Sequence, residues 1–536
     1  MSDTIRLDGK SLTAEDVATV AYEEIPVELS STAHEAVTLS RERIQTVLDS
    51  DEAIYGVSTG FGRLVDERIG DDDRHELQRN LLRSHAAGTG DPLPVPIVRA
   101  MLVTRANALA KGFSGVRPLI IERLIELLNA GVHPVVPRRG SLGASGDLAP
   151  LAHLGLVLIG EGQATVSGET VDGDTALSDA GIDPIELEAK EGLALINGTQ
   201  LSLAIAALAV VHTRRVVDAA DTAGALTTEV TLSTTANCDP GIAAVRPHQG
   251  HTATAENIRR LTEDSEVIQT HGECERVQDV YSIRCMPQIH GAVRTALEHL
   301  TQVVEVELNA ATDNPLVFSS DTVDDRAPGA GDAAVLSGGN FHGEPLSLPL
   351  EYLQQALATL ATVSERRVDR LVNPAFQEDH LPPFLAREPG LESGYMIAQY
   401  TSASLGNHAR TRGNPSADNV SVSGNQEDHV SMSGEVALAV WETLESVRTA
   451  IGIELLCAVE ASRYLEDKLT HGVGTAAAID EVRDRVSPLS KDREIAPDIE
   501  AIDDLIASGE LSTTLESVLG SPLRNQATVP DAAGYR

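Results

Sequence analysis

Lysine, cysteine and aromatic residues are all scarce in this chain of 536 residues. Only five of its 41 basic residues are lysines, and 80 Asp and Glu bring the formal net charge to −39 at pH 7. That charge excludes a protein that binds nucleic acid by neutralising phosphates. Few lysines beside many carboxylates are typical of a salt-adapted surface, because carboxylates hold hydration and counter-ions while molar salt screens their repulsion. An ordinary acidic protein is the alternative.

The four cysteines form no CxxC or CxC pair, so we expect neither a zinc site of that type nor a disulfide framework. This usage fits a reducing cytoplasm. The first residues lack the basic and apolar regions of a secretory signal. The most apolar stretch, residues 201–211, is too short to cross a bilayer. The sequence therefore predicts a cytoplasmic protein with no membrane contact.

Apolar residues spaced by three and four positions predict long helices in the second half of the chain. This spacing runs through residues 350–372, where Asn373 and Pro374 end it, and again through residues 436–455. Residues 201–221 are rich in Ala and apolar on nearly every side, which predicts a helix buried all round. A helical bundle is the simplest fold that covers such faces.

Two stretches depart from the helical pattern. Residues 163–184 alternate Val and Thr and contain Ser-Gly and Asp-Gly turns, which predicts a small β-hairpin. Residues 319–334 are acidic and rich in Gly, Pro and Ala, so they are predicted to form a surface loop.

Residues 140–150, GSLGASGDLAP, form a run of small residues before an apolar segment. In one interpretation, Ser145 or Asp147 caps the next helix. In another, the amide nitrogen of Gly146 attacks the carbonyl carbon of Ala144. Loss of two water molecules, one of which carries away the Ser145 hydroxyl, then leaves a methylidene-imidazolone electrophile. Glycine permits the close approach that this ring closure needs.

Local sequence alone does not decide between these interpretations. The same loop nearly matches the G-x-S-x-G turn of serine hydrolases, but Asp147 replaces the last Gly and no strand pattern leads into the turn, which disfavours a nucleophile elbow. Ala-Ser-Gly also recurs at residues 507–509, so the tripeptide by itself is a weak signal. The other motifs in the sequence are needed to choose between these interpretations.

Five motifs, in order along the chain, carry a resemblance to a known family. They are YGVSTGFG at 55–62, SHAAGTG at 84–90, GSLGASGDLAP at 140–150, QDVYSIRCMPQ at 278–288 and NQEDHVSM at 425–432. With them the chain resembles the histidine ammonia-lyase family, a branch of the aromatic amino-acid ammonia-lyases. The resemblance implies a mainly α fold, with a long antiparallel helical bundle and an N-terminal part carrying the electrophile loop.

The same resemblance implies three parts, an activity and a cofactor. We expect residues 1–200 to carry the cofactor-forming loop, residues 201–480 to form the central bundle, and residues 481–536 to form a C-terminal helical segment and tail. The implied enzyme is a carbon–nitrogen lyase that eliminates ammonia from L-histidine, the first step of histidine degradation, and yields trans-urocanate. Its cofactor would be 4-methylidene-imidazol-5-one (MIO) from Ala144, Ser145 and Gly146, with no external cofactor.

Metal and oligomer expectations follow as well. His248 and His251 have a metal-like spacing, but no clear third ligand is nearby in sequence, so no metal is expected. Members of the family are homotetramers in which neighbouring subunits complete each active site, and a homotetramer is therefore expected here.

Four residues receive roles at the amino-acid end of the substrate. Tyr55 is implied to be the base that removes the β-proton, which requires a phenolate stabilised well below the ordinary pKa of about 10. Arg284 would clamp the substrate carboxylate with its planar guanidinium group. Gln278 would bind substrate and Tyr281 would join the catalytic set, both on the face of Arg284 if this segment is helical. A solvated polar face is the alternative.

Four others receive roles around the ring and the cofactor. Asn197, expected at a strand-to-helix junction, would help to hold substrate and cofactor, and Phe341 would pack beside them or simply belong to the core. His85 and Glu427 match the pair that binds the substrate imidazole. An enzyme acting on phenylalanine has no use for a carboxylate there, because burying it against a phenyl ring is uncompensated.

Departures from the family pattern leave two rival hypotheses. Ser58 stands where Asn is usual, and His408 and Ala409 stand where Glu-Asn is common. One rival is a related lyase or aminomutase acting on phenylalanine or tyrosine. The other is a helical scaffold whose tripeptide never cyclises.

Overall fold

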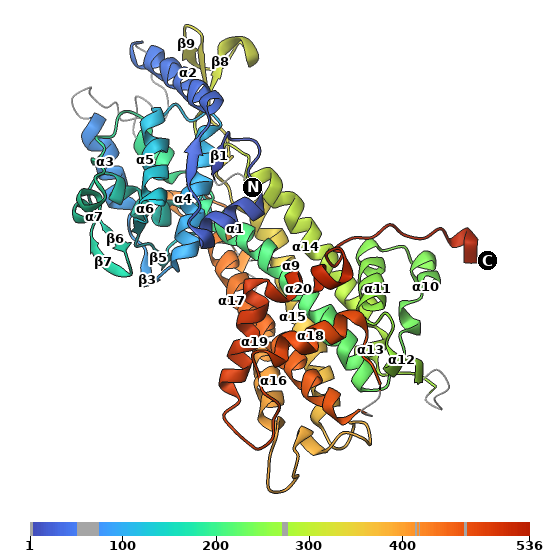
Figure 1. Ribbon diagram of the computed structural model, residues 1–536. Coiled ribbons are helices and arrows are strands. Elements are labelled where there is room, and N and C mark those ends of the chain that lie inside the picture. The colour runs from blue at the N-terminus through green and yellow to red at the C-terminus, as the bar shows by residue number, and fades with distance from the viewer. Residues whose placement is uncertain are drawn as a thin grey trace. The chain divides into compact units, whose positions relative to one another are not determined.

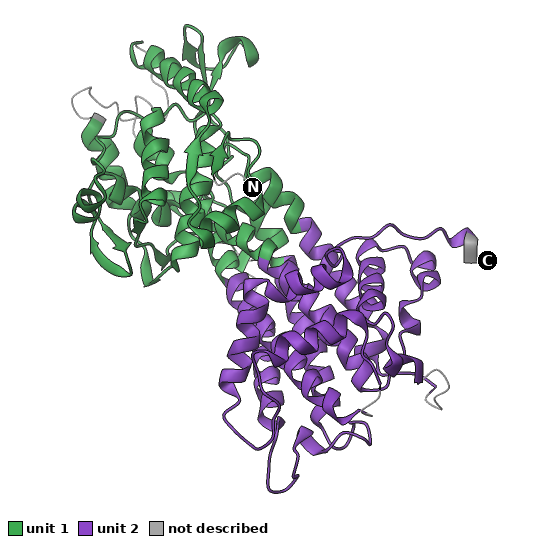
Figure 2. Ribbon diagram, viewed as in Figure 1, with its two compact units in different colours: residues 1–211, 300–351, 414–438 green, residues 212–299, 352–413, 439–536 purple. Residues whose placement is uncertain are grey.

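The structure is a computed structural model (Figure 1) and describes residues 4–50, 74–270, 277–412, 415–417, 419–465 and 469–535. The chain divides into two compact units (Figure 2). Unit 1 comprises residues 1–211, 300–351 and 414–438, and unit 2 comprises residues 212–299, 352–413 and 439–536. The predicted division at residues 200 and 480 stays a prediction.

Helices dominate both units, which confirms the mainly α fold class; the antiparallel order of the bundle stays a prediction. In unit 1 the helices are α1 (Ala14–Glu23), α2 (Ser31–Leu48), α3 (Arg74–His85), α4 (Val95–Ala110), α5 (Pro118–Asn129), α6 (Leu148–Leu158), α7 (Gly173–Ala180) and α8 (Glu191–Ile196). Helix α4 packs against α1 and α5, while α6 packs against α3 and α8. These helix contacts fix the position of α6, which begins directly after the loop at residues 140–147.

Unit 2 is built from helices as well. They are α10 (Pro240–Val245), α11 (Gln249–Leu261), α12 (Glu266–Thr270), α13 (Tyr281–Arg284), α16 (Met396–Thr411), α18 (Val473–Arg483), α19 (Ala496–Ser508) and α20 (Glu510–Leu519). Four of the five boundaries between the units fall inside the four longest helices of the described residues, which are α9 (Gln200–Val230), α14 (Met286–Glu307), α15 (Glu344–Val372) and α17 (Ser433–Ala461).

The long predicted helices are confirmed, although each is longer than its apolar pattern. Helix α9 is buried on every side from Leu203 to Val210, as expected. It continues past residue 221, and there the buried Thr222 and Thr228 hydroxyls are satisfied by donating to carbonyls one turn earlier. Helix α15 ends where the sequence predicts, at Val372 before Asn373-Pro374.

The strands are short and belong mainly to unit 1. They form a parallel pair β1 (Ile5–Leu7) with β2 (Val27–Leu29), an antiparallel pair β3 (Thr89–Pro92) with β5 (Pro137–Arg139), and two three-stranded antiparallel sheets. One of these has the order β4 (His133–Pro134), β6 (Gln163–Val166), β7 (Glu169–Asp172). Its β6–β7 turn confirms the predicted hairpin over residues 163–172, whereas residues 173–180 of the predicted stretch form helix α7.

The predicted surface loop at residues 319–334 is wrong in part. This segment enters the second sheet, whose order is β8 (Leu316–Ser319), β10 (Ala333–Leu336), β9 (Gly329–Ala330). Val317 and Val335 pack against Ile44 and Val47 of α2, so apolar burial holds the strands together despite the Gly- and Pro-rich composition between them. Among the described residues, no helix is long and apolar enough to span a membrane.

Candidate active site

The loop at residues 140–147 joins β5 to α6 in unit 1. Contrary to the sequence prediction, a short strand does lead into it: β5 ends at Arg139, which pairs with Thr89 of β3. Eight residues separate this strand from the start of α6 at Leu148. A nucleophile elbow needs the serine on a sharp strand-to-helix turn, so a loop of this length still does not fit one.

Two glycines shape the loop because no other residue fits there. Gly146 has φ +78°, and its Cα faces the backbone of Gly198 so closely that a Cβ would overlap Gly198. The amide of Asp147 donates to the Gly198 carbonyl over 2.6 Å. Gly143 has φ +64° and lies against the hydroxyls of Ser431 and Ser433, where a Cβ would also collide.

Asp147 anchors the end of the loop instead of capping α6 through its side chain. It occupies the N-cap position of α6, in agreement with one interpretation of the sequence, but its side chain makes no cap hydrogen bond there. Its buried carboxylate accepts from the Ser141 hydroxyl over 2.6 Å and from the Ser202 amide, in the first turn of α9, over 2.9 Å. Burial raises the pKa of Asp147.

Ser145 lies between two residues that the sequence analysis selected. Its hydroxyl donates to Glu427 Oε1 over 3.0 Å, and its carbonyl accepts from the Asn197 side-chain amide over 2.8 Å. Ala144 is buried, whereas Ser145 and Glu427 are half-buried. The fold therefore brings together three predicted residues that are up to 282 positions apart.

The buried guanidinium group of Arg105 holds Asn197 through a hydrogen bond to its carbonyl. Asn197 follows α8 and precedes α9, so the expected strand-to-helix junction is instead a helix-to-helix junction. The guanidinium of Arg105, on α4, donates to the carbonyls of Asn197 and Ala194 and to the side chain of Gln200. Burial lowers the pKa of Arg105 to about 10. Sequence reasoning missed Arg105, because nothing local distinguishes it from other helical arginines.

His85 and Phe341 lie in the same unit. His85 ends α3, and its Nδ1 lies 2.8 Å from the Leu81 carbonyl oxygen, a contact in which only Nδ1–H can donate. In a neutral ring with this tautomer, Nε2 is the nitrogen that can accept a hydrogen bond. Phe341 is half-buried and lies two residues before Gly343, whose amide donates to the Gly143 carbonyl over 2.9 Å. This bond joins the segment of Phe341 to the glycine loop.

In unit 2, Gln278, Tyr281 and Arg284 are neighbours but not along one helix. Helix α13 has only four residues, Tyr281–Arg284, and Gln278 precedes it in irregular chain, so the predicted single helical face is wrong. Arg284 still donates to the Gln278 side-chain oxygen, and its Cζ lies 4.8 Å from the centre of the Tyr281 ring. Tyr281 is 69% exposed.

Side chains from elsewhere in unit 2 hold α13 in place. Arg367 donates to the Ser282 carbonyl over 3.1 Å, and the Asn237 amide donates to the carbonyls of Ile283 and Arg284. Arg367 is itself fully buried and paired with Glu454 over 2.6 and 2.9 Å. No local sequence pattern marks Arg367 or Asn237, since their role depends on contacts distant along the chain.

The remaining selected residues divide into two groups. Tyr55 and Ser58 lie outside the described residues. His408 is engaged at both nitrogens, by the Ser446 hydroxyl over 2.9 Å and by Arg412 over 2.6 Å, so this departure from the family pattern has its own local partners. His251 Nε2 bonds to the side-chain amide of Gln288 over 2.9 Å.

Comparison with known proteins gives consistent matches over nearly the whole chain. The profile of the aromatic amino acid lyase family matches residues 12–484. A probable histidine ammonia-lyase of Halobacterium salinarum is 56% identical over 522 residues, covering 97% of this chain and 99% of that protein. A histidine ammonia-lyase of Natranaerobius thermophilus is 45% identical over 517 residues, covering 96% of this chain and 99% of that protein.

Solved structures agree with these sequence matches. A histidine ammonia-lyase from Trypanosoma cruzi shares 37% identity with a TM-score of 0.87, covering 99% of this chain and 96% of that one. A tyrosine aminomutase from Streptomyces globisporus shares 34% identity with a TM-score of 0.90, covering 97% of this chain and 100% of that one.

Proposed function

Since the chain belongs to the aromatic amino acid lyase family, we propose that it is a histidine ammonia-lyase, which converts L-histidine to trans-urocanate and ammonia. The observation that carries the choice of substrate is the hydrogen bond from Ser145 to Glu427. It puts a carboxylate beside the loop that carries the reactive serine. A carboxylate accepts a hydrogen bond from an imidazole N–H, and a phenyl ring offers it no such donor.

The proposed cofactor is MIO, formed from Ala144, Ser145 and Gly146, and the loop fits its formation. Gly146 presents an amide unhindered by a side chain, and its backbone is held against Gly198. Asn197 orients the Ser145 carbonyl, while Glu427 accepts from the hydroxyl that must leave. Once formed, the ring supplies an electrophile for the amino nitrogen of the substrate, which makes ammonia a better leaving group.

The protein's own residues bind and orient the substrate. Arg284 is proposed to hold the carboxylate through its guanidinium group, beside Gln278 and Tyr281. At the other end, His85 Nε2 is proposed to accept a hydrogen bond from one imidazole N–H, and Glu427 from the other. Phe341 is proposed to pack against the ring. An imidazole with both nitrogens protonated then has a partner for each.

Proton removal is proposed to fall to Tyr55, with Tyr281 in the catalytic set. A β-hydrogen is weakly acidic, so the base must act on a substrate that is already oriented and whose leaving group is improved. Tyr281 is largely exposed in one chain, and Val277 and Val280 beside it are 93% and 40% exposed. This exposure supports a homotetramer in which another subunit covers the segment and completes the site.

A second candidate is an aminomutase or lyase acting on an aromatic amino acid other than histidine. The likeness to the tyrosine aminomutase of Streptomyces globisporus favours it, because that protein has the same fold at 34% identity. Against a phenylalanine enzyme stands Glu427, whose charge a phenyl ring would leave uncompensated. A phenol hydroxyl can donate to a carboxylate, so the substrate assay has to separate histidine from tyrosine. The absence of an external cofactor and the cytoplasmic location stay predictions.

The test is to incubate the purified protein separately with L-histidine, L-tyrosine and L-phenylalanine and to record the product spectrum. We expect urocanate from histidine and far slower release of coumarate or cinnamate. Intact mass should also fall short of the sequence mass by two water molecules. Formation of a β-amino acid from tyrosine, with no urocanate from histidine, would contradict the proposal.

A further inference from the structure

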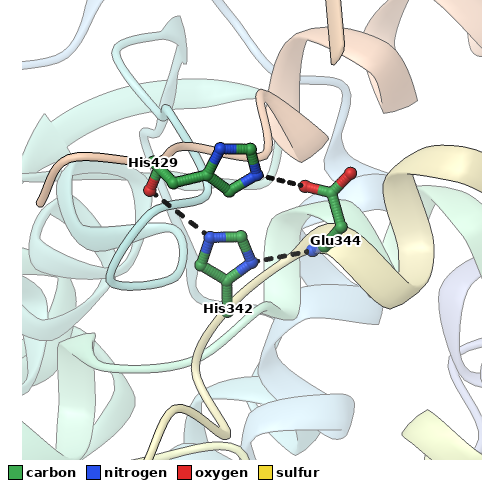
Figure 3. Close-up of side chains that lie close together, drawn as sticks. All are labelled: His342, Glu344 and His429. Atoms are coloured by element: carbon green, nitrogen blue, oxygen red, sulfur yellow. Dashed lines mark hydrogen bonds and ion pairs between the residues drawn. The ribbon is translucent and has the colours of Figure 1, made fainter. Parts of the chain in front are cut away.

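Three side chains of metal-ligating type lie together in unit 1, close to the glycine loop but apart from the roles assigned above. They are His342, Glu344 and His429 (Figure 3). His342 and Glu344 flank Gly343 at the start of α15, and His429 comes from the segment between Glu427 and Ser431. Each offers one ligand atom, and these atoms all lie within 4.8 Å of one another.

The spacing is close to that of a small coordination site. His429 Nε2 lies 3.5 Å from Glu344 Oε2, and in a tetrahedral zinc site with bonds of about 2.0–2.2 Å two donor atoms lie roughly 3.3–3.6 Å apart. The imidazole rings of His342 and His429 are nearly parallel, with centres 5.6 Å apart. All three ligand atoms lie within 4.8 Å of one another, so side-chain shifts of about 1 Å would close the site, and the side chain of His429 is 60% exposed.

One oxygen atom of the cluster, Oε2 of the Glu344 carboxylate, has no hydrogen-bond donor. Glu344 Oε2 is shielded from solvent and has no hydrogen-bond partner, although it belongs to a carboxylate. The His429 contact at 3.5 Å is too long to serve as a hydrogen bond. The Glu344 side chain as a whole is 31% exposed and lies at ion-pair distance from His429, but its shielded oxygen has no hydrogen-bond donor. A cation bound between this oxygen and the two rings would supply the missing partner.

The ring of His342 is only weakly engaged. Its Nδ1 accepts from the Glu344 amide over 3.3 Å, and its Nε2 lies 3.5 Å from the His429 carbonyl oxygen, as the dashed lines in Figure 3 show. Both contacts are at or beyond the long end of the normal range, so releasing one of them costs little. One ring nitrogen of His342 is therefore available to a metal.

We propose that His342, Glu344 and His429 bind one divalent transition-metal ion of the zinc class. Two imidazoles and one carboxylate form the donor set of zinc sites that keep a fourth position open for water or an anion. Imidazole ligands disfavour Mg²⁺ and Ca²⁺, which take oxygen donors. The net charge of −39 adds a long-range attraction for cations.

The bound ion would also brace the reactive loop. Gly343, between two of the ligands, donates to the Gly143 carbonyl, and Ser431, two residues after His429, donates to the same carbonyl over 2.9 Å. A metal that joins His342 and Glu344 to His429 would tie together the two segments that hold Gly143. Binding should therefore raise the thermal midpoint of the folded protein.

The test uses full-length protein without a histidine tag, stripped with a chelator and titrated with Co²⁺ in a buffer free of histidine. Co²⁺ replaces Zn²⁺ in such sites and reports its coordination by visible absorption. We expect one Co²⁺ per chain, with bands typical of nitrogen and oxygen ligands. His342→Gln, Glu344→Gln and His429→Gln should each weaken binding by at least about tenfold.

His248→Gln is the matched control, since it removes a histidine of metal-like spacing outside the cluster and should leave Co²⁺ binding unchanged. Circular dichroism of each stripped variant checks its fold, and three separate positions keep the test independent of any one variant. A wild-type protein that takes up no Co²⁺, variants that bind as well as wild type, or a thiolate absorption band would each overturn the proposal.

Discussion

Ser145 is held at both of its oxygen atoms, by Glu427 at the hydroxyl and by Asn197 at the carbonyl. The hydroxyl is the group that ring formation must eliminate. Ser145→Ala keeps the backbone and removes only that hydroxyl, so we expect turnover of histidine to be abolished while the fold persists. Rates on L-histidine, circular dichroism and intact mass measure the three parts of this prediction, and the variant should not show the loss of two water molecules.

The chain supplies a matched control for this substitution. Ser508 occupies the second Ala-Ser-Gly, at the end of α19, where its hydroxyl donates to the Leu505 carbonyl. Ser508→Ala should leave both the activity and the mass deficit of the wild-type protein. Normal turnover in Ser145→Ala would refute the role of Ser145.

Glu427→Gln tests the choice of substrate at the same scale. Glutamine keeps an oxygen that can accept from Ser145 but loses the charge, and hydrogen bonds to charged groups are worth about 1.5–3 kcal/mol. We therefore expect kcat/KM for histidine to fall by roughly ten- to a hundredfold. The thermal midpoint should change little, because Glu427 is only half-buried. Histidine kinetics equal to those of wild type would contradict the assignment of Glu427 to the imidazole.

At the scale of elements, helix α13 depends for its stability on hydrogen bonds from side chains outside it. Four residues are too few for a helix to be stable alone, because nucleation is unfavourable and the last carbonyls lack partners. Arg367 and Asn237 supply those partners from outside the helix. Since α13 carries Tyr281 and Arg284, their positions rest on side chains that never touch the substrate.

Asn237→Ala should therefore impair substrate binding more than stability. It leaves the carbonyls of Ile283 and Arg284 without this donor, and we expect KM for histidine to rise by about tenfold, in line with about 1.4 kcal/mol for a lost hydrogen bond. Steady-state kinetics and thermal unfolding measure the two effects. Asn373→Ala is the control, because its amide bonds to Asp369 in the same unit and does not contact α13. An unchanged KM in Asn237→Ala would contradict the positioning role of Asn237.

For the molecule as a whole, the charge of −39 predicts dependence on salt. Repulsion between carboxylates is screened beyond about 3 Å in 1 M salt but reaches about 10 Å in 0.1 M salt. We expect the thermal midpoint and the activity on histidine to fall when molar potassium chloride is replaced by dilute buffer. Sorbitol at equal osmolality is the control, since it screens no charge and should not restore them. Unchanged structure and activity after dialysis would contradict a salt-adapted surface.

Much of the architecture was predictable because the signals are local. The three- and four-residue spacing of apolar residues predicted α9, α15 and α17, and the turn residues near residue 167 predicted the β6–β7 hairpin. The small-residue loop around Ser145 could be recognised because ring formation needs three adjacent residues of particular types. Within residues 319–334 the loop prediction missed the strand residues Ser319, 329–330 and 333–334, since their sheet is stabilised by packing against α2 rather than by local propensity.

The sequence by itself therefore determined the helices, the reactive tripeptide and the surface charge, all of which depend on neighbouring residues or on composition. Only the tertiary structure decided which side chains meet. Glu427 accepts from the Ser145 hydroxyl, and Arg105 donates to the Asn197 carbonyl. Arg367 donates to a carbonyl of α13, and His429 lies beside His342 and Glu344. These partners are tens to hundreds of residues apart. Their contacts follow from how buried helices pack and how buried polar groups find partners, which no local pattern encodes.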